Sequence, residues 1–395
     1  MKVLSSQDQA AAHLYEVPSR SRSDINFRLL LSILLSACCT LAWFVCVTYF
    51  NQWDRISDLG PAAFTMVFGS VVAGSTPQGG GVVAFPVFTK VFGTPPEVAR
   101  TFSFCIQSVG MTAGAAWIVI NRKPIEWRAL FIVTGSAIIG LVATRHFATL
   151  PSEPFRPAIF SAPYVKVTFT FLLIATALVV YLVSRIKKRE TRSSLPPMNG
   201  RVIGVLFFCG LMGGAASGLV GSGAELFLYL AVVLFLSVDP KVGVPTSVVC
   251  MAIVSLVGMV LFAFVDGQFF VGLNAEGAVN SVGGLSVAFK DATLVYGAGA
   301  AAPQRKFDLF GLWLACVPVV VWGAPIGTWI ASCLSSRNLL RFVTLLALIE
   351  GLTTVMFLKP LQTDGYLALY FLVGITLTIF LLWYVASRRE RTFGA

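Results

Sequence analysis

Eight runs of about twenty apolar residues recur along the chain and restrict it to one kind of fold. A helix that crosses the hydrocarbon core of a bilayer needs roughly 20 such residues, and the runs have this length: 29–50, 101–120, 128–147, 164–186, 243–265, 309–332, 339–358 and 366–386. Only 12% of the 395 residues are charged, whereas soluble domains carry about 25%. Because so few charges cannot cover a water-facing surface, the sequence predicts an all-α polytopic membrane protein.

Two further apolar tracts, 61–93 and 202–237, are too long for a single crossing. An unbroken helix of that length would measure about 50 Å, far more than the thickness of the hydrocarbon core. Glycines interrupt both tracts, at Gly79, Gly80 and Gly81 in the first and at Gly221 and Gly223 in the second. We expect each tract to break there, either as two half-helices or as a re-entrant hairpin.

The basic residues predict the orientation of the helices. The net charge of +11 would suit a nucleic-acid partner, but most Lys and Arg lie in tails and short loops, where they mark the cytoplasmic side. Five clusters stand out: Arg20, Arg22 and Arg28; Arg122, Lys123 and Arg128; Arg185, Lys187, Lys188, Arg189 and Arg192; Arg337 and Arg341; Arg388, Arg389 and Arg391. All five share one side only if each broken tract enters and leaves by the same face. Both termini are then cytoplasmic, and the two tracts enter from opposite faces.

The chain also contains an internal repeat. An offset of 144 residues pairs Gly69 with Gly213, Gly74 with Gly218, Gly79 with Gly223, Pro96 with Pro240, Val98 with Val242, Ser103 with Ser247 and Gly114 with Gly258. A second match relates residues 136–140 to 323–327 at an offset of 187. The loop 266–306, which we place outside the cell, accounts for the difference between the two offsets. The sequence therefore predicts two copies of one module with opposite topology.

These features divide the chain into five expected segments. They are a cytoplasmic tail (1–28), a first half with repeat I (29–186), a basic cytoplasmic linker (187–201), repeat II (202–358), and a last helix with a cytoplasmic tail (359–395). Inverted repeats with an interrupted hydrophobic segment in each half are typical of secondary transporters. A broken helix survives in lipid only where it is buried or lines a polar cavity, so we expect the breaks to mark a substrate site.

The sequence around the first break resembles a known family. Residues 73–81 read AGSTPQGGG, followed by Pro86, Gly93 and the segment VARTFS at 98–103. This pattern is similar to the first signature of the TauE/SafE sulfite exporter family, also called 4-toluene sulfonate uptake permeases, and residues 218–225 (GLVGSGAE) with Thr246 and Ser247 are similar to its second copy. The resemblance covers about 63–358 and implies transport of sulfite, sulfonates or related sulfur-containing anions.

One departure from the family pattern concerns the second break. Where the family has a glycine triplet, this chain has Gly223, Ala224 and Glu225, and an apolar residue stands at the later proline position. The departure bears on the substrate and the coupling ion more than on the fold.

The expected substrate site lies at the two tips. Glycine lets backbone N–H groups approach a ligand, and the N-termini of half-helices favour anions. The candidate binding residues are Gln78, Gly79, Gly80, Gly81, Ser103, Gln107, Gly221, Ser222, Gly223, Thr246 and Ser247. The alternatives are that the glycines serve close helix packing and that the hydroxyls bond back to carbonyls of their own helices.

Two carboxylates, Glu225 and Glu350, lie deep in apolar sequence. A charge in the membrane interior is costly and marks a functional site by default, so both are candidates for proton coupling. The alternative is a neutral glutamic acid bonded to nearby carbonyls.

We therefore predict a secondary transporter of small anions in the cell membrane, with no enzymatic activity, no cofactor and no metal. An anion channel and a proton-coupled uptake permease for another small organic acid remain alternatives. An intramembrane enzyme is disfavoured because no HExxH motif and no GxSxG motif at membrane depth occurs. The expected partners are a small anionic substrate and the lipid bilayer, without nucleic acid, and a homodimer is left open.

Overall fold

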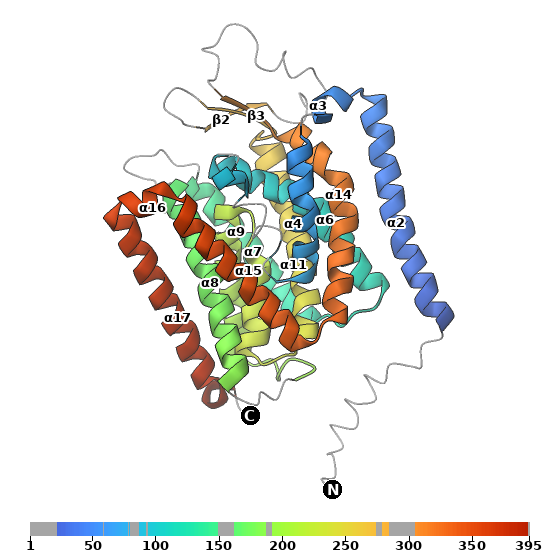
Figure 1. Cartoon of the computed structure of the whole chain (residues 1–395). Helices are drawn as coiled ribbons and strands as arrows, with labels where there is room; N and C mark the ends of the chain where they lie inside the picture. The colour runs from blue at the N-terminus through green and yellow to red at the C-terminus, as the bar shows by residue number, and fades with distance from the viewer. Residues whose placement is uncertain are drawn as a thin grey trace.

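The computed structural model describes residues 22–57, 59–77, 79, 87–91, 94–148, 162–186, 192–273, 279–283 and 305–393. Within these ranges, nine helices have twenty or more residues, and eight of them lie outside the two broken tracts (Figure 1). They are α2 (Arg22–Tyr49), α6 (Pro96–Ile120), α7 (Trp127–Ala148), α8 (Ala162–Ile186), α11 (Pro240–Met259, continued by the π-helix η4, Val260–Val265), α14 (Leu309–Cys333), α15 (Ser336–Phe357) and α17 (Gly365–Phe393). The short helices α3 (Trp53–Ser57) and α16 (Lys359–Thr363) connect neighbours at one end.

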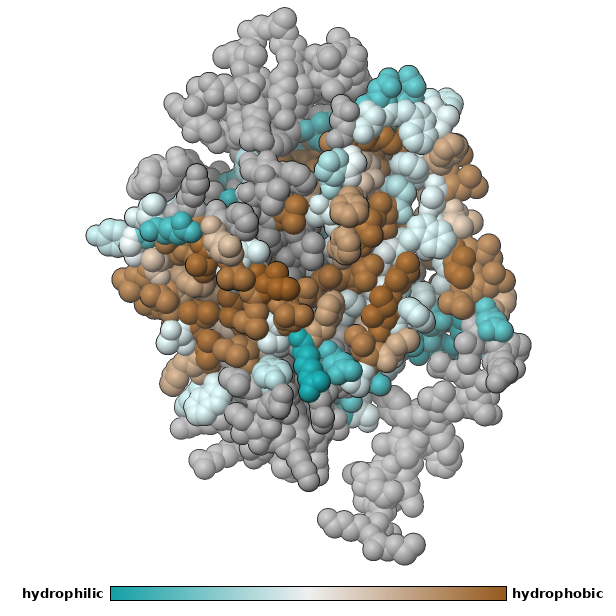
Figure 2. Space-filling view, in the orientation of Figure 1, coloured by the Kyte–Doolittle hydropathy of each residue, from teal (hydrophilic) through white to brown (hydrophobic). Residues whose placement is uncertain are grey.

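Seven of the described helices are long and apolar enough to cross a membrane. Hydrophobic side chains form a band around the middle of the molecule, whereas hydrophilic residues gather toward the two ends (Figure 2). The outward faces of α2 and α17 contribute to this apolar surface, with exposed Leu34, Phe44, Leu372 and Phe380. The prediction of an all-α polytopic membrane protein is confirmed.

The two glycine-rich tracts break where the sequence predicts. The first consists of α4 (Gly60–Ser75) and the π-helix η1 (Val87–Val91), and the second of α9 (Gly200–Val220), α10 (Ala224–Tyr229) and η3 (Leu230–Phe235). Gly79, Gly221 and Gly223 have φ angles of 68°, 83° and 147°, which only glycine adopts readily. The second tract is not two equal halves, because α9 alone measures about 31 Å at 1.5 Å per residue.

Each re-entrant helix packs against a helix of the other repeat. α4 lies along α14, where a Cβ on Gly327 would overlap the carbonyl oxygen of Val71. α9 lies along α7, where a Cβ on Gly140 would come within 2.9 Å of the backbone nitrogen of Ala215. The two contacts are equivalent, because Gly140 and Gly327 are related by the offset of 187, and Val71 and Ala215 by that of 144. The glycines of these interfaces thus serve close packing.

A small sheet is the exception to the helical architecture. The strands β1 (Phe270–Leu273), β2 (Val279–Gly283) and β3 (Arg305–Asp308) form an antiparallel sheet in the order β2-β1-β3. It lies within the loop between η4 and α14, for which the sequence predicted no regular structure. The sheet is at the end of the molecule opposite to the start of α2 and the end of α17 (Figure 1).

Candidate functional site

The tips of the two broken tracts meet inside the bundle. Gly79, just beyond the end of α4, is buried, and a Cβ at this position would overlap Oε1 of Glu225 and lie 3.5 Å from Oε1 of Gln107. The backbone of the first tip therefore packs directly against side chains of α10 and α6. The other predicted residues of this tip, Gln78, Gly80 and Gly81, lie outside the described residues.

The second tip is held by a polar stripe on α6. The Oγ of Ser103 donates a hydrogen bond to the carbonyl of Gly221 (3.1 Å), as does Nε2 of Gln107 (3.0 Å), and Nη1 of Arg100 donates to the carbonyl of Gly218 (3.3 Å). Positions three and four apart share one face of a helix, which brings the three side chains into line. They satisfy carbonyl oxygens that the last turn of α9 leaves without partners.

Sequence reasoning assigned no site role to Arg100, although its spacing from Ser103 places both on one face of α6. Its side chain is 5% exposed. The guanidinium lies 4.3 Å from the centroid of the Phe262 ring, a cation–π contact that helps to hold a charge in apolar surroundings. Arg100 thus lies beside the second tip and is buried, rather than anchoring the helix at the surface.

The backbone N–H groups at the start of α10 already have partners. The N–H of Gly223 donates to Oε2 of Glu225 (3.1 Å), and the N–H of Ala224 donates to Oγ of Ser217 (3.0 Å). The carboxylate of Glu225 therefore occupies the place at which an external anion would meet these groups. These two N–H groups are therefore not available to an external anion in this conformation.

Three buried polar atoms around the second tip lack a hydrogen-bond partner in the described part of the chain. They are Oε1 of Gln107, Oε1 of Glu225 and Oγ of Ser222. The residues are 4%, 1% and 1% exposed, respectively. Buried polar atoms without partners are uncommon in proteins, so these three indicate a place for a ligand.

The remaining predicted hydroxyls lie elsewhere. Thr246 accepts a hydrogen bond from the N–H of Glu126 (3.0 Å), and Ser247 donates to the carbonyl of Val244 in its own helix (2.8 Å). α6 and α11 are antiparallel, with Gly114 opposite Val248 and Phe104 opposite Gly258. Ser247 is therefore displaced from Ser103 by about twelve helix positions, or roughly 18 Å along the axis. The two repeat-related serines do not share one pocket.

The side chain of Glu350, the other predicted coupling carboxylate, lies outside the described residues.

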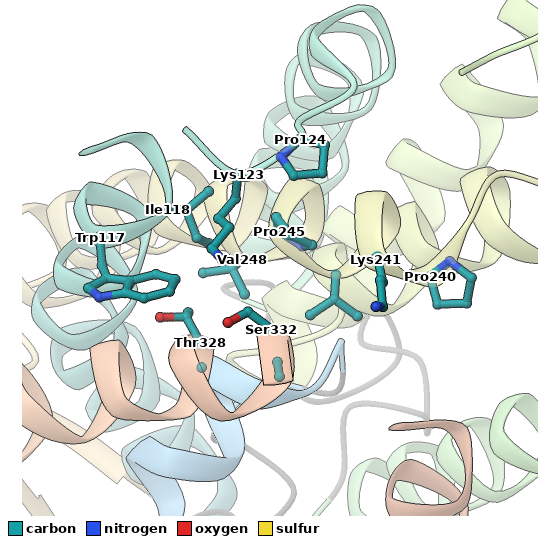
Figure 3. A pocket seen from close by; sticks show the side chains of 13 residues that line it. Trp117, Ile118, Lys123, Pro124, Pro240, Lys241, Pro245, Val248, Thr328 and Ser332 are labelled. Atoms are coloured by element: carbon teal, nitrogen blue, oxygen red, sulfur yellow. The ribbon is translucent and has the colours of Figure 1, made fainter. Parts of the chain in front are cut away.

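A cavity of about 160 Å³ lies between α6, α11, α14 and the end of α4. Engineered cavities of about 150 Å³ bind benzene, so there is room for a small oxyanion. Lys123 and Thr328 approach the cavity from opposite walls (Figure 3), and the exposed Lys241 also lines it. The cavity reaches the buried Gly74, one residue before the end of α4. It thus leads from the surface toward the first tip.

Among the described residues, no group of three or more His, Cys, Asp or Glu side chains could hold a metal ion.

The class of protein follows from three features together. They are the hydrophobic exterior, the inverted repeats and the broken helices beside a cavity, and they define a multi-pass membrane transporter. The family model described as sulfite exporter TauE/SafE matches residues 62–354, from α4 to α15.

The chain therefore belongs to the TauE/SafE sulfite exporter family, as the resemblance around the first tip indicates. This is a family of membrane transporters of sulfur-containing anions. Searches of curated proteins and of solved structures found no match.

Proposed function

We propose that the protein carries sulfite, sulfonates or related sulfur-containing organic acids across the cell membrane by alternating access. The observation that carries this proposal is the cavity that reaches Gly74 of the first re-entrant helix and has Lys123 and Lys241 in its wall. Two ammonium groups near the entrance favour an anion, and glycines allow backbone N–H groups to approach the oxygens of a ligand. The first tip, with Gln78, Gly79, Gly80 and Gly81, is the proposed anion site.

The orientation of the molecule follows from its basic loops. The cavity lies at the end of the bundle that carries Arg122 and Lys123, and cytoplasmic loops are enriched in such residues. The conformation is then inward-facing, with both termini in the cytoplasm. At the opposite end, Arg145 of α7 pairs with Asp266, which follows η4 (Nε to Oδ2, 2.9 Å). The pair joins the two repeats on the closed side.

The membrane potential would favour export of an anion that crosses alone. A charge that crosses it gains or loses about 2.3 kcal/mol per 100 mV, so an anion leaves a negative interior without a coupling ion. Uptake requires one, and the buried Glu225 supports coupled uptake as a second candidate function.

The test is transport of radiolabelled sulfite, taurine, sulfoacetate and sulfate in proteoliposomes. We expect saturable flux of at least one of these substrates and counter-transport by the unlabelled compound. Replacing Lys123 or Lys241 by Gln should raise the apparent KM about tenfold. Arg128→Gln, which removes a charge that does not line the cavity, is the matched control. Flux that neither saturates nor shows counter-transport would instead favour an anion channel.

A further inference from the structure

Two hydrogen-bond acceptors converge at the second tip without a donor between them. Oε1 of Gln107 and Oε1 of Glu225 both face the backbone of Gly79. Neither atom has a partner within the described part of the chain. Two oxygen atoms with partial or full negative charge repel each other in a medium of low dielectric constant, so a donor proton or a cation beside them would stabilise the arrangement.

The orientation of the Gln107 amide is determined by its other contacts. Its Nε2 donates to the carbonyl of Gly221, an atom that can only accept hydrogen bonds. A flipped amide would place two acceptors against each other there and lose the bond. Oε1 of Gln107 must therefore be the atom that faces Gly79 and Glu225.

The contacts of Glu225 include one donor to its carboxylate and the carboxyl end of a neighbouring helix. The N–H of Gly223 donates to Oε2, which stabilises the ionised group and leaves Oε1 for a ligand. The nearby carbonyls of Gly218 and Gly221 end α9, and the C-terminal end of a helix carries partial negative charge. The guanidinium of Arg100 contacts Gly218 and Phe262.

The two repeats differ at the positions that supply these oxygens. At the offset of 144, Glu225 corresponds to Gly81 and Gln107 corresponds to Met251. The first tip therefore lacks both side-chain oxygens, whereas the second tip has them and has filled its own backbone N–H groups.

We propose that the second tip binds a sodium ion through Oε1 of Glu225 and Oε1 of Gln107. Ser222, whose buried hydroxyl lies on the same tip, is a third oxygen ligand. In broken-helix transporters, helix C-terminal ends and unwound backbone carry the coupling cation, and the end of α9 provides this environment. Sodium binding itself is independent of the transported substrate, whereas a role as coupling ion rests on the proposed function.

The direct test is binding of ²²Na⁺ to the purified full-length protein in detergent, measured by scintillation proximity. We expect saturable binding that excess unlabelled Na⁺ displaces and K⁺ does not. Glu225→Gln keeps the shape of the side chain but removes its charge, and Gln107→Met installs the residue of the other repeat. Both should weaken binding at least tenfold. Glu126→Gln, the same substitution in the loop between α6 and α7, should leave binding unchanged.

The outcomes separate this proposal from the proposed function. Wild-type protein that binds no ²²Na⁺, or two variants that bind it as well as wild type, would overturn the sodium site. Transport that responds to a pH gradient and not to Na⁺, and loses this response in Glu225→Gln, would overturn it in favour of a proton. Sodium binding without sulfite flux would support the site and contradict the proposed function. Elution of each variant as a single species by size exclusion controls for folding.

Discussion

At the scale of single residues, the absence of one methyl group decides how closely the re-entrant helices approach their partners. A Cβ on Gly327 would overlap the carbonyl of Val71 and lie 3.1 Å from Cα of Gly74. These neighbours are backbone atoms, which cannot rotate away as a side chain can. Overpacking of this kind costs about 1–3 kcal/mol.

Gly327→Ala should therefore lower the thermal stability of the protein in detergent by several degrees. Gly135→Ala is the matched control, because a Cβ on Gly135 meets no atom within 4 Å. It should leave stability unchanged or raise it, since alanine is favoured over glycine inside a helix by about 0.5–1 kcal/mol. Equal effects of the two substitutions on the unfolding temperature would contradict the close packing of α4 on α14.

Gly79 is constrained both by its backbone and by its neighbour. Its φ of 68° is unfavourable for any residue with a Cβ, and the added atom would overlap the carboxylate of Glu225. Gly79→Ala should separate the two tips and reduce the initial rate of sulfite transport at least tenfold, with protein abundance in the membrane unchanged. Gly204→Ala is the control, because a Cβ on this glycine of α9 also meets nothing within 4 Å. If Gly79→Ala transported sulfite at the wild-type rate, the contact between Gly79 and Glu225 would not be needed for transport.

At the scale of elements, the sequence predicted the arrangement of the bundle better than the details of its breaks. Hydrophobic length and the glycine clusters were enough for the polytopic helical bundle and for its breaks, because lipid leaves few alternatives for the backbone. Seven of the described helices are long and apolar enough to cross a membrane, and they include α9 but neither α8 nor α15. The full length of α9 was not predicted, since the interrupted tract was expected to form two half-helices or a re-entrant hairpin. The glycines at 210, 213, 214 and 218 lie within this continuous helix, and close packing was the alternative given for such glycines.

The candidate site was predicted only in part, for a physical reason. The tips, Ser103, Gln107 and Glu225 were singled out by glycine spacing and by polarity within apolar sequence. Repeat symmetry placed Thr246 and Ser247 with them, but an inverted repeat puts equivalent residues at opposite depths. Arg100 was assigned no site role because a charge near a helix end usually reaches the interface, and only tertiary contacts reveal its burial.

The ion pair between Arg145 and Asp266 joins elements of the two repeats at the end opposite to the cavity. The two side chains are 26% and 15% exposed. Exposed ion pairs stabilise a conformation by about 0–1 kcal/mol. Loss of this pair would therefore shift the equilibrium between inward-facing and outward-facing states severalfold at most. Asp266→Asn should decrease hydrogen exchange in the segment 240–248, which lines the cavity, as the outward-facing state gains population. Mass spectrometry of the deuterated protein measures this. Asp54→Asn, an exposed carboxylate on α3, is the control, and unchanged exchange at 240–248 would argue against a gate.

At the scale of the whole molecule, cationic side chains and unpartnered oxygen atoms gather at different places. Lysines line the cavity that leads toward the first tip, and carboxylate and amide oxygens surround the second. If one anion and one cation cross together, their charges cancel and the membrane potential does no net work on the pair. The asymmetry of the repeats thus links the structure to the electrical character of transport.

This link predicts that Glu225→Gln changes how transport responds to voltage. Wild-type protein should accumulate a singly charged sulfonate to a level that depends on the sodium gradient and not on an imposed potential. Without the carboxylate, the anion would cross alone, and its accumulation ratio should change by about 50-fold per 100 mV, which corresponds to about 2.3 kcal/mol per charge. Potassium gradients with valinomycin in proteoliposomes set the potential, and Glu126→Gln is the control. Two results would show that the second tip does not carry the compensating charge. One is accumulation by Glu225→Gln that does not change with the membrane potential, and the other is accumulation by the wild type that does.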